Sequence, residues 1–331
     1  MKNILVFGGA GYCGSLLVPQ LLEDGWKVRV FDKFWYDPKF PKHSHLECLE
    51  GDVRDIKAVR KACEGQQVIL HLACISNDAS FELDENLSTS VNLDSFEPLV
   101  LAAKEAGAER FVFASSSSVY GVSDSPDVKE DHPLVPLTLY NKYKGMCEPL
   151  LLKHVDETFT GVVFRPATVC GYAPRQRLDL SVNILTNHAV NNRKILVFGG
   201  DQLRPNLHVQ DYVDLCKCLV SAPREKINGE IFNCGFQNMS IMNIAQTVRD
   251  VVQEVYPDFG EIPIEVTTSD DPRSYHINSD KIFKVLGFRP QYSVEDAVRD
   301  LCLAFKAGKL PNSFDDNRYF NVRTMKSMRV T

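Results

Sequence analysis

Several features that would place this chain in a special class are missing from its 331 residues. No C-x-x-C pair occurs among the ten cysteines, and the close pair Cys216 and Cys218 has no second pair nearby. We therefore expect no metal site. Every apolar run is shorter than the roughly 18 residues that a membrane-spanning helix requires, so no membrane partner is expected. The net charge of −6 has the wrong sign for binding nucleic acid.

The sequence also has little that would mark it as anything other than a globular protein. It contains no internal repeat and no low-complexity linker, and its first residues have the pattern of a strand rather than of a signal peptide. Hydrophobic residues make up 44% and charged residues 24% of the chain, which is ordinary for a globular protein. We expect a cytoplasmic protein with reduced cysteines, built as one large domain or two closely joined ones.

The first residues combine a buried strand, a glycine-rich turn and the start of a helix. Residues 4–7 form an apolar run that suits a strand of a parallel sheet and is too short for a core helix. Gly8, Gly11 and Gly14 follow with the spacing G-x-x-G-x-x-G, and residues 15–22 have a helical pattern. Such a turn lets a phosphate reach backbone N–H groups at a helix N-terminus. The segment therefore predicts a dinucleotide-binding turn.

An acidic residue follows the second expected strand, residues 26–31. This residue, Asp32, comes 18 positions after Gly14. A carboxylate at this place accepts hydrogen bonds from both ribose hydroxyls of an adenosine and repels a 2′-phosphate. The sequence therefore favours NAD over NADP as the cofactor, although the neighbouring Lys33 would tolerate a phosphate.

Strand and helix patterns alternate through the first half of the chain. This alternation predicts an α/β fold with a doubly wound parallel sheet of the Rossmann type and helices on both faces. Ligands bind at the carboxyl edge of such a sheet. Further strands are expected at residues 46–49, 67–73, 110–114, 194–198 and 230–233. Helices are expected up to residue 63, at 87–106, from 140, and at 209–222, 240–255 and 293–307, before a polar tail.

A run of four serines, residues 115–118, ends the strand at 110–114 and presents hydroxyls to the ligand edge. Farther on, Tyr140 and Lys144 are four residues apart and share one helix face, whereas Tyr143 has no lysine four residues later. A lysine ammonium and a positive nicotinamide ring would both favour the phenolate of a tyrosine, whose ordinary pKa is about 10. Such a tyrosine can take a proton from a sugar hydroxyl while a hydride leaves the same carbon.

Together these residues resemble the extended short-chain dehydrogenase/reductases, and among them the nucleotide-sugar epimerase/dehydratase group. The resemblance covers nearly the whole chain. Besides the glycine-rich turn and Asp32, it rests on residues 51–53 (GDV), 71–73 (HLA), Asn92, 115–121 (SSSSVYG), 140–144 (YNKYK), 165–171 (RPATVCG), 204–211 (RPNLHVQD), 233–235 (NCG), 271–273 (DPR) and 286–290 (LGFRP).

The resemblance implies an enzyme that uses NAD, and it assigns roles by position. Ser116 occupies the place of the family's catalytic serine or threonine, Tyr140 that of the base, and Lys144 that of its partner, which also holds the nicotinamide ribose. The implied cofactor-binding residues at the adenosine diphosphate part are Gly8, Gly11, Tyr12, Cys13 and Gly14 at the pyrophosphate, Asp32 and Lys33 at the adenosine ribose, and Asp52 and Val53 at the adenine. The remaining part of the cofactor would be contacted by Leu72, Ala73, Tyr140 and Lys144.

Arginines carry the implied contacts to the substrate. Arg204 and Arg273 match family arginines that pair with the diphosphate, which suits bidentate Arg–phosphate geometry; surface ion pairs are the alternative. Residues 172–183 form an expected substrate loop with Arg175, Arg177 and Asn183. This loop is similar to those of subfamilies that act on GDP- or CDP-linked deoxysugars and heptoses. A solvated basic edge is the alternative for its two arginines.

Two departures from the family pattern concern the reaction. In the sugar 4,6-dehydratases an Asp and a Glu follow the catalytic Ser or Thr and serve in water elimination. Here the two positions are Ser117 and Ser118, which we expect to contact the substrate without supplying a carboxyl acid/base pair. In addition, Thr168 stands where the family commonly has an Asn that contacts the substrate. Because Ser117 and Ser118 lack the carboxyl pair, the usual 4,6-elimination is disfavoured, whereas Thr168 changes an expected substrate contact.

The sequence thus predicts an enzyme that oxidises C4 of a nucleotide-sugar, with a 4-epimerase as the leading hypothesis and a 4-dehydrogenase that releases the ketone as the alternative. A carbonyl reductase that uses NADPH fits Asp32 poorly, and an NAD-sensing regulator would not need Tyr140 and Lys144. We expect NAD binding in residues 1–170 and in later segments that rejoin them. Residues 171–331 would form a smaller, partly interleaved substrate domain. By resemblance, helix 87–106 and the helix from Tyr140 would form a four-helix homodimer interface.

Overall fold

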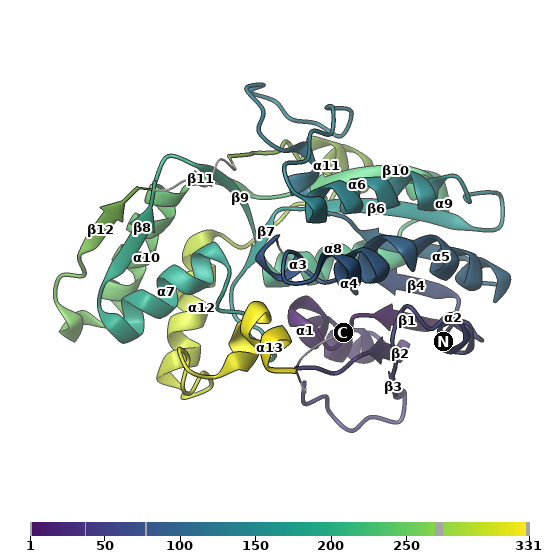
Figure 1. Ribbon diagram of the computed structural model, residues 1–331, viewed down its shortest axis with the longest axis horizontal. Helices are drawn as coiled ribbons and strands as arrows, with labels where there is room; N and C mark the ends of the chain where they lie inside the picture. The colour runs from purple at the N-terminus through teal and green to yellow at the C-terminus, as the bar shows by residue number, and fades with distance from the viewer. Residues whose placement is uncertain (1, 37, 77, 269–273, 329–331) are drawn as a thin grey trace.

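The computed structural model describes residues 2–36, 38–76, 78–268 and 274–328. Within them, seven parallel strands form one sheet in the order β10-β6-β5-β4-β1-β2-β3 (Figure 1). These strands are β1 (Asn3–Phe7), β2 (Lys27–Asp32), β3 (Leu46–Glu50), β4 (Val68–His71), β5 (Arg110–Ala114), β6 (Thr160–Pro166) and β10 (Glu230–Cys234). The order reverses between β1 and β4, and ligands bind at the carboxyl ends of the strands at such a point.

Helices cover both faces of this sheet. Successive side chains of a strand point to opposite faces, and because those on both faces are apolar, each face has to be buried. Ile4 and Val6 of β1 pack into one core, whereas Leu5 and Phe7 pack into the other. The first core contains α1 (Tyr12–Glu23), α8 (Val209–Ser221) and α11 (Asp280–Leu286); the second contains α2 (Ile56–Cys63), α5 (Phe96–Glu105) and α6 (Leu139–Leu152). The doubly wound α/β fold that the sequence predicts is confirmed.

The second half of the chain builds a smaller unit with a core of its own. Its helices are α7 (Ser181–Asn192), α10 (Ile241–Val255) and α12 (Val294–Lys306), which Figure 1 shows beside the pair of strands β8 (Ile195–Phe198) and β12 (Ile264–Thr267). A three-stranded sheet of β7 (Thr168–Cys170), β9 (Leu203–His208) and β11 (Gln237–Ser240) lies between this unit and the large sheet. Between β9 and β11 the chain returns to the large sheet through β10, which pairs with β6.

The short elements complete the described chain. They are α3 (Asp78–Phe81), α4 (Glu85–Thr89), η1 (Ser90–Asp94), η2 (Ser117–Tyr120), α9 (Arg224–Ile227), η3 (Pro257–Phe259), η4 (Asn317–Tyr319) and α13 (Asn321–Met328). Of the helices in the described ranges, none has both the length and the apolar character needed to cross a bilayer. The ten cysteines are free thiols.

The single helix expected over residues 87–106 is wrong, since a π-helical turn, η1, separates α4 from α5. The wide turn carries Asn92, whose side chain exchanges two hydrogen bonds of 2.9 Å with the backbone of Ile75. Pro98, in the first turn of α5, has no N–H to continue a regular helix from the preceding turn. The interruption therefore fixes the loop after β4 against this helix.

The polar tail expected at the C-terminus is also wrong, because α13 packs against the first half of the chain. Met325 is buried in a small cluster with Ile75 and Leu87, and Trp35 packs against the cluster. Figure 1 shows α13, in yellow, next to the N-terminal segment that contains α1 and β2. Helix α13 thus lies beside the ligand edge of the sheet.

A buried ion pair connects the elements that border this edge. Arg165 of β6 donates two hydrogen bonds, of 2.9 and 2.6 Å, to the carboxylate of Glu148 in α6, and both side chains are 3% exposed. The Ser115 hydroxyl donates to the same carboxylate at 2.6 Å. Arg165 also donates to the Tyr120 hydroxyl at 2.6 Å, which in turn donates to Asn233 of β10 at 2.7 Å. Residues at the end of β5 and in β6, α6 and β10 therefore all take part in the hydrogen-bond network of this ion pair.

We predict that Glu148→Gln lowers the free energy of unfolding by about 3–5 kcal/mol, because it leaves the Arg165 charge buried without its counterion. Urea unfolding followed by circular dichroism measures the loss. Glu254→Gln is the matched control, since Glu254 forms a similar two-bond pair with Arg299 on an exposed surface. The control should be close to the wild type, and equal losses in the two variants would contradict the prediction.

Candidate functional site

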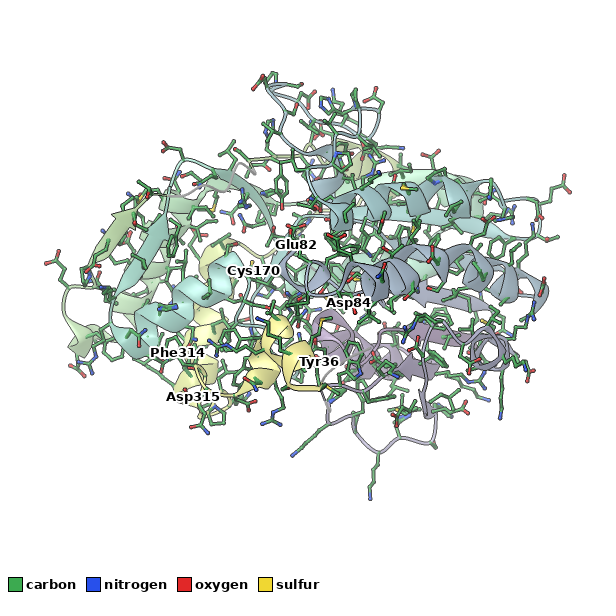
Figure 2. All side chains as sticks on the ribbon, in the orientation of Figure 1. Tyr36, Glu82, Asp84, Cys170, Phe314 and Asp315 are labelled. Carbon is green, nitrogen blue, oxygen red and sulfur yellow. The ribbon has the colours of Figure 1, made fainter. Side chains whose placement is uncertain are left out.

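The described residues line a cavity of about 650 Å³ at the carboxyl ends of β1, β2, β4 and β5. Gly8 follows β1, Asp32 ends β2, Leu72 follows β4 and Ser115 follows β5, so the first half of the chain supplies one wall. Strands β7 and β9 and helix α7 supply lining residues from the second half, and α13, which packs against the first half, supplies Asn321 and Met325. Figure 2 labels Cys170, which ends β7, near the middle of the molecule between these two parts.

The glycine-rich turn fits closely against the chain around it. Gly8 has φ +78°, and a Cβ there would lie 2.5 Å from the backbone nitrogen of Ala73. A Cβ at Gly14 would lie 2.4 Å from the carbonyl oxygen of Gly9, so the start of α1 approaches the turn as only glycine permits. Gly11 is the N-cap of α1, and no described side chain caps it. The first N–H groups of α1 and the positive end of its dipole therefore border the cavity.

The residues predicted at the adenosine end lie together in the cavity wall. Asp32 accepts hydrogen bonds from the backbone N–H groups of Ala10 at 2.9 Å and Phe34 at 3.0 Å, while burial raises the pKa of its carboxyl group. Lys33 points its ammonium toward Asp52 at 3.6 Å. Partial burial opposes ionisation of Asp52, yet the hydrogen bonds and charge of Arg54 hold its pKa below the usual value. Val53, Leu72, Ala73 and Cys13 also line the cavity.

Two predicted ligand residues use their side chains to hold the loop after β7. The Tyr12 hydroxyl donates to the carbonyl of Gly171 at 2.6 Å and accepts from the Asn183 amide at 3.2 Å. Asn183 also accepts from the N–H of Gly171 at 3.0 Å. Tyr12 lines the cavity. Asn183 is fully buried and is not among the described residues that line the cavity. These bonds fasten the loop to α1.

The serine run and the Tyr/Lys pair meet in the same cavity, where Ser116, Ser117, Ser118, Tyr140 and Lys144 are all lining residues. The hydroxyls of Ser116 and Ser118 are 2.7 Å apart, and Ser118 donates in turn to Asn141, next to Tyr140. Lys144 donates to the carbonyl oxygen of Ala114 at 2.7 Å. Two hydrogen bonds therefore join the segment at the end of β5 to the first turns of α6: Ser118 to Asn141, and Lys144 to Ala114.

The environment of Tyr140 differs in one respect from the sequence prediction. In this structure burial raises the pKa of Tyr140 well above its ordinary value, and the nearby carboxylate of Asp78 raises it further. The positive charge of Arg177 acts in the opposite direction and lowers the pKa. Asp78 also accepts a hydrogen bond from Thr138, the N-cap of α6, and so helps to fix the start of the helix that carries Tyr140.

The predicted substrate residues fall into two groups. Thr168 of β7 and Arg204 of β9 line the cavity on the side of the smaller unit, and the Arg204 guanidinium lies 5.4 Å from the ring centre of Tyr275. Arg175 and Arg177 also line the cavity, and each contacts both halves of the chain: Ser15, Tyr36 and Ser76 in the first half, and Asp179 and Asn321 in the second. Arg273 lies outside the described residues.

Sequence reasoning missed several residues of the cavity wall. They come from loops and from the C-terminal helix, and they are Trp35, Tyr36, Ser76, Asp78, Asp179, Asn321 and Met325. Nothing in a local pattern distinguishes such residues, because they reach the site only through the path of the folded chain. The i, i+3 spacing of Val322 and Met325 was the one signal that could have revealed α13.

Residues 4–235 match the model of the NAD dependent epimerase/dehydratase family. The chain belongs to this family. It is therefore an enzyme of the nucleotide-sugar epimerase/dehydratase group, and its cofactor is NAD. Its glycine-rich turn, the uncapped start of α1 in the described chain and Asp32 fit that dinucleotide, because they offer donors to a pyrophosphate and a carboxylate to a ribose.

Relatives that catalyse different reactions have similar sequence identity to this chain. A dTDP-D-glucose 4,6-dehydratase of Mus musculus is 28% identical, with 90% of this chain and 87% of that protein covered. A UDP-glucose 4-epimerase of Lactobacillus helveticus is 26% identical, with 95% and 99% covered. The structure of MoeE5 in complex with UDP-glucuronic acid and NAD has the same fold, with a TM-score of 0.81, 24% identity, and 93% and 100% of the two chains covered.

We predict that Gly8→Ala abolishes measurable NAD binding, since the new Cβ would collide with the backbone of residue 73 and would also strain the left-handed backbone. Isothermal titration calorimetry with NAD measures the effect. Gly25→Ala is the control, because Gly25 has a similar φ of +84° but no described neighbouring atom within 4 Å of the new Cβ. It should cost about 1 kcal/mol of stability and keep the NAD affinity. Retained affinity in Gly8→Ala would show that the close approach is not needed.

Proposed function

We propose that this chain is an NAD-dependent nucleotide-sugar 4-epimerase, which oxidises the C4 hydroxyl of the sugar and returns the hydride to the opposite face of the ketone. The observation that carries the proposal is the convergence of Tyr140, Lys144 and Ser116 in the cavity that the glycine-rich turn borders. Bound NAD supplies the hydride acceptor and, on the way back, the donor. The protein supplies the base, the orientation and the enclosure.

In the proposed reaction Tyr140 takes the C4 hydroxyl proton, and the Ser116 hydroxyl turns from Ser118 to donate its hydrogen bond to the reacting oxygen. Burial keeps Tyr140 protonated in the chain alone, so the phenolate must be favoured by positive charge that arrives with the oxidised nicotinamide ring. Lys144 has one N–H committed to Ala114, and its other N–H groups remain for the nicotinamide ribose and the Tyr140 oxygen. The same tyrosine then returns the proton when the ketone is reduced.

The absence of carboxylates at two positions favours epimerisation over 4,6-dehydration. Ser117 and Ser118 line the cavity directly after Ser116, and a serine hydroxyl cannot act as the acid/base pair that removes water from C5 and C6. Relatives of this chain include both a 4,6-dehydratase and a 4-epimerase, so the family alone does not choose between them. The residues that follow Ser116 support the epimerase.

The second half of the chain is proposed to hold the nucleotide part of the substrate. Arg204 lies on that side of the cavity with Tyr275, in a place suited to the substrate diphosphate, and Thr168, also in the cavity wall, is proposed to contact the sugar. In this division residues 1–170, with β10, hold NAD, whereas residues 171–331 mainly hold the nucleotide-sugar. Figure 1 shows the large sheet and the smaller unit on either side of β7 and β9.

A homodimer through α5 and α6 is part of the same proposal. Leu101 of α5 is 37% exposed and Met146 of α6 is 42% exposed, and both helices lie on the same outer face of the sheet. Two copies that pair these helices would cover both side chains in a four-helix bundle.

We predict that Tyr140→Phe lowers turnover by about 10²–10⁴-fold, because it removes the proposed base and leaves the ring in place. Tyr143→Phe is the matched control, since Tyr143 lies on the same helix and its hydroxyl contacts Thr89 rather than the cavity residues. The control should keep nearly full turnover, with both variants assayed at saturating NAD and substrate. Undiminished turnover of Tyr140→Phe would rule out the proposed base.

We also predict the product. Incubation of the enzyme with UDP-, GDP-, CDP- and dTDP-sugars, followed by chromatography and NMR, should give the C4 epimer of one of them with no net reduction of NAD. Accumulation of a 4-keto sugar with an equal amount of NADH would instead identify a 4-dehydrogenase. A 4-keto-6-deoxy sugar as the exclusive product would overturn the argument from Ser117 and Ser118.

A further inference from the structure

We propose that Arg175 and Arg177, held by Asn321 of the C-terminal helix, form a clamp on the pyrophosphate of NAD. The sequence places both arginines in a substrate loop, but the structure brings them to the cofactor side of the cavity. The inference goes beyond the proposed function, because it concerns how the dinucleotide is held and applies whichever sugar is oxidised. It also gives α13, which lies beyond the residues that match the family model, a part in the site.

Arg175 lies against the segments that follow β1 and β2. Its backbone N–H donates to the hydroxyl of Ser15, in the first turns of α1, at 3.0 Å. The Cζ atom of its guanidinium lies 3.5 Å from the ring centre of Tyr36, in the loop after Asp32. Figure 2 labels Tyr36 at the edge of the N-terminal half, where the C-terminal segment meets it. Arg175 therefore lies near the helix end that a pyrophosphate would approach.

Arg177 lies beside the segment that follows β4. One terminal nitrogen of its guanidinium donates to the Ser76 hydroxyl at 3.2 Å, and its Nε donates to Asp179 at 2.9 Å. Although burial disfavours its charge, the Asp179 carboxylate holds the pKa of Arg177 above the ordinary value. Arg177 is therefore charged, and its position is fixed from two sides.

Asn321, the first residue of α13, joins the two arginines. Its side-chain oxygen accepts a hydrogen bond from Arg175 at 2.6 Å, and its side-chain nitrogen donates to Ser76 at 3.0 Å. Its backbone N–H donates to Asp179 at 3.0 Å, so both partners of Arg177 are also partners of Asn321. Met325, one turn later, anchors α13 in the cluster beside the cavity. The C-terminal helix thus sets the positions of both guanidinium groups.

Each arginine of the clamp has a buried N–H donor with no hydrogen-bond acceptor among the described residues. Arg175 is 5% exposed and Arg177 is 8% exposed, yet Nε of the first and Nη2 of the second lack a hydrogen-bond partner among the described residues. A buried donor without a partner is costly. Burial lowers the pKa of Arg175 to about 10, and the charge of Arg177 lowers it further. An anion with two charges, bound between the arginines, would supply both missing acceptors and relieve their repulsion.

The contacts favour the pyrophosphate of the cofactor over the diphosphate of the substrate. Ser15, Tyr36 and Ser76 follow β1, β2 and β4, the strands on either side of the point where the sheet order reverses. A dinucleotide crosses the sheet edge at that point. Arg204, the proposed ligand of the substrate diphosphate, comes from β9 on the side of the smaller unit.

Two ligands separate a pyrophosphate contact from a general loss of structure: ADP-ribose contains the pyrophosphate, and adenosine lacks it. We expect Arg175→Gln to weaken ADP-ribose binding about 10–100-fold, the effect of losing a charge-assisted hydrogen bond, and to leave adenosine and UDP affinities within twofold. Isothermal titration calorimetry on the purified full chain measures all three. Arg204→Gln is the matched control and should weaken UDP while sparing ADP-ribose. No turnover is needed, so failure of the epimerase proposal would leave these expectations unchanged.

Two outcomes would overturn the clamp. If Arg175→Gln weakens UDP and spares ADP-ribose, the arginines serve the substrate; if it weakens adenosine and ADP-ribose equally, they only support the fold. Should Arg175→Gln fail to fold, Asn321→Ala removes its acceptor and leaves both arginines in the chain. That variant should also weaken ADP-ribose more than adenosine, and an unchanged ratio between the two would exclude α13 from the site.

Discussion

A buried ion pair between Arg165 and Glu148 is the constraint on which the arrangement of the site depends. Two opposite charges with almost no access to water are tolerated only when every donor and acceptor is paired. Here the pairing requires the end of β5, the strand β6, the helix α6 and the strand β10 to meet in one geometry. A shift of β5, β6 or α6 would break a hydrogen bond to a buried charge, and a shift of β10 would break the bond between Tyr120 and Asn233.

The same pair sets the rotation of the helix that carries the proposed base. Tyr140, Lys144 and Glu148 are spaced by four residues and therefore lie along one face of α6. Glu148 is fixed by Arg165 and Ser115, and Lys144 by the carbonyl of Ala114. Lys144 and Glu148, one and two turns after Tyr140, both contact the end of β5. Tyr140 therefore lies in the cavity wall beside the serine run. Stability and the geometry of the site thus share one set of contacts.

Much of the site could be predicted from short sequence patterns because its parts are local. A glycine turn between a strand and a helix, Asp32 at a strand end, and Tyr140 four residues before Lys144 each depend on neighbours in the chain, and all line the cavity. The contacts of Arg175 were beyond this reach. Its partner Asn321 is 146 positions away, and no periodicity connects a loop after β7 to a helix at the C-terminus.

By itself, the sequence determined the doubly wound sheet, the turn for a dinucleotide and the order in which the predicted catalytic side chains meet the sheet edge. It could do so because the two periodicities of helix and strand, and the special backbone freedom of glycine, are properties of short segments. Only the tertiary structure decided which residues Arg175 and Arg177 contact and that α13 lines the cavity. Those choices follow from buried polar groups that must find partners wherever the folded chain brings them.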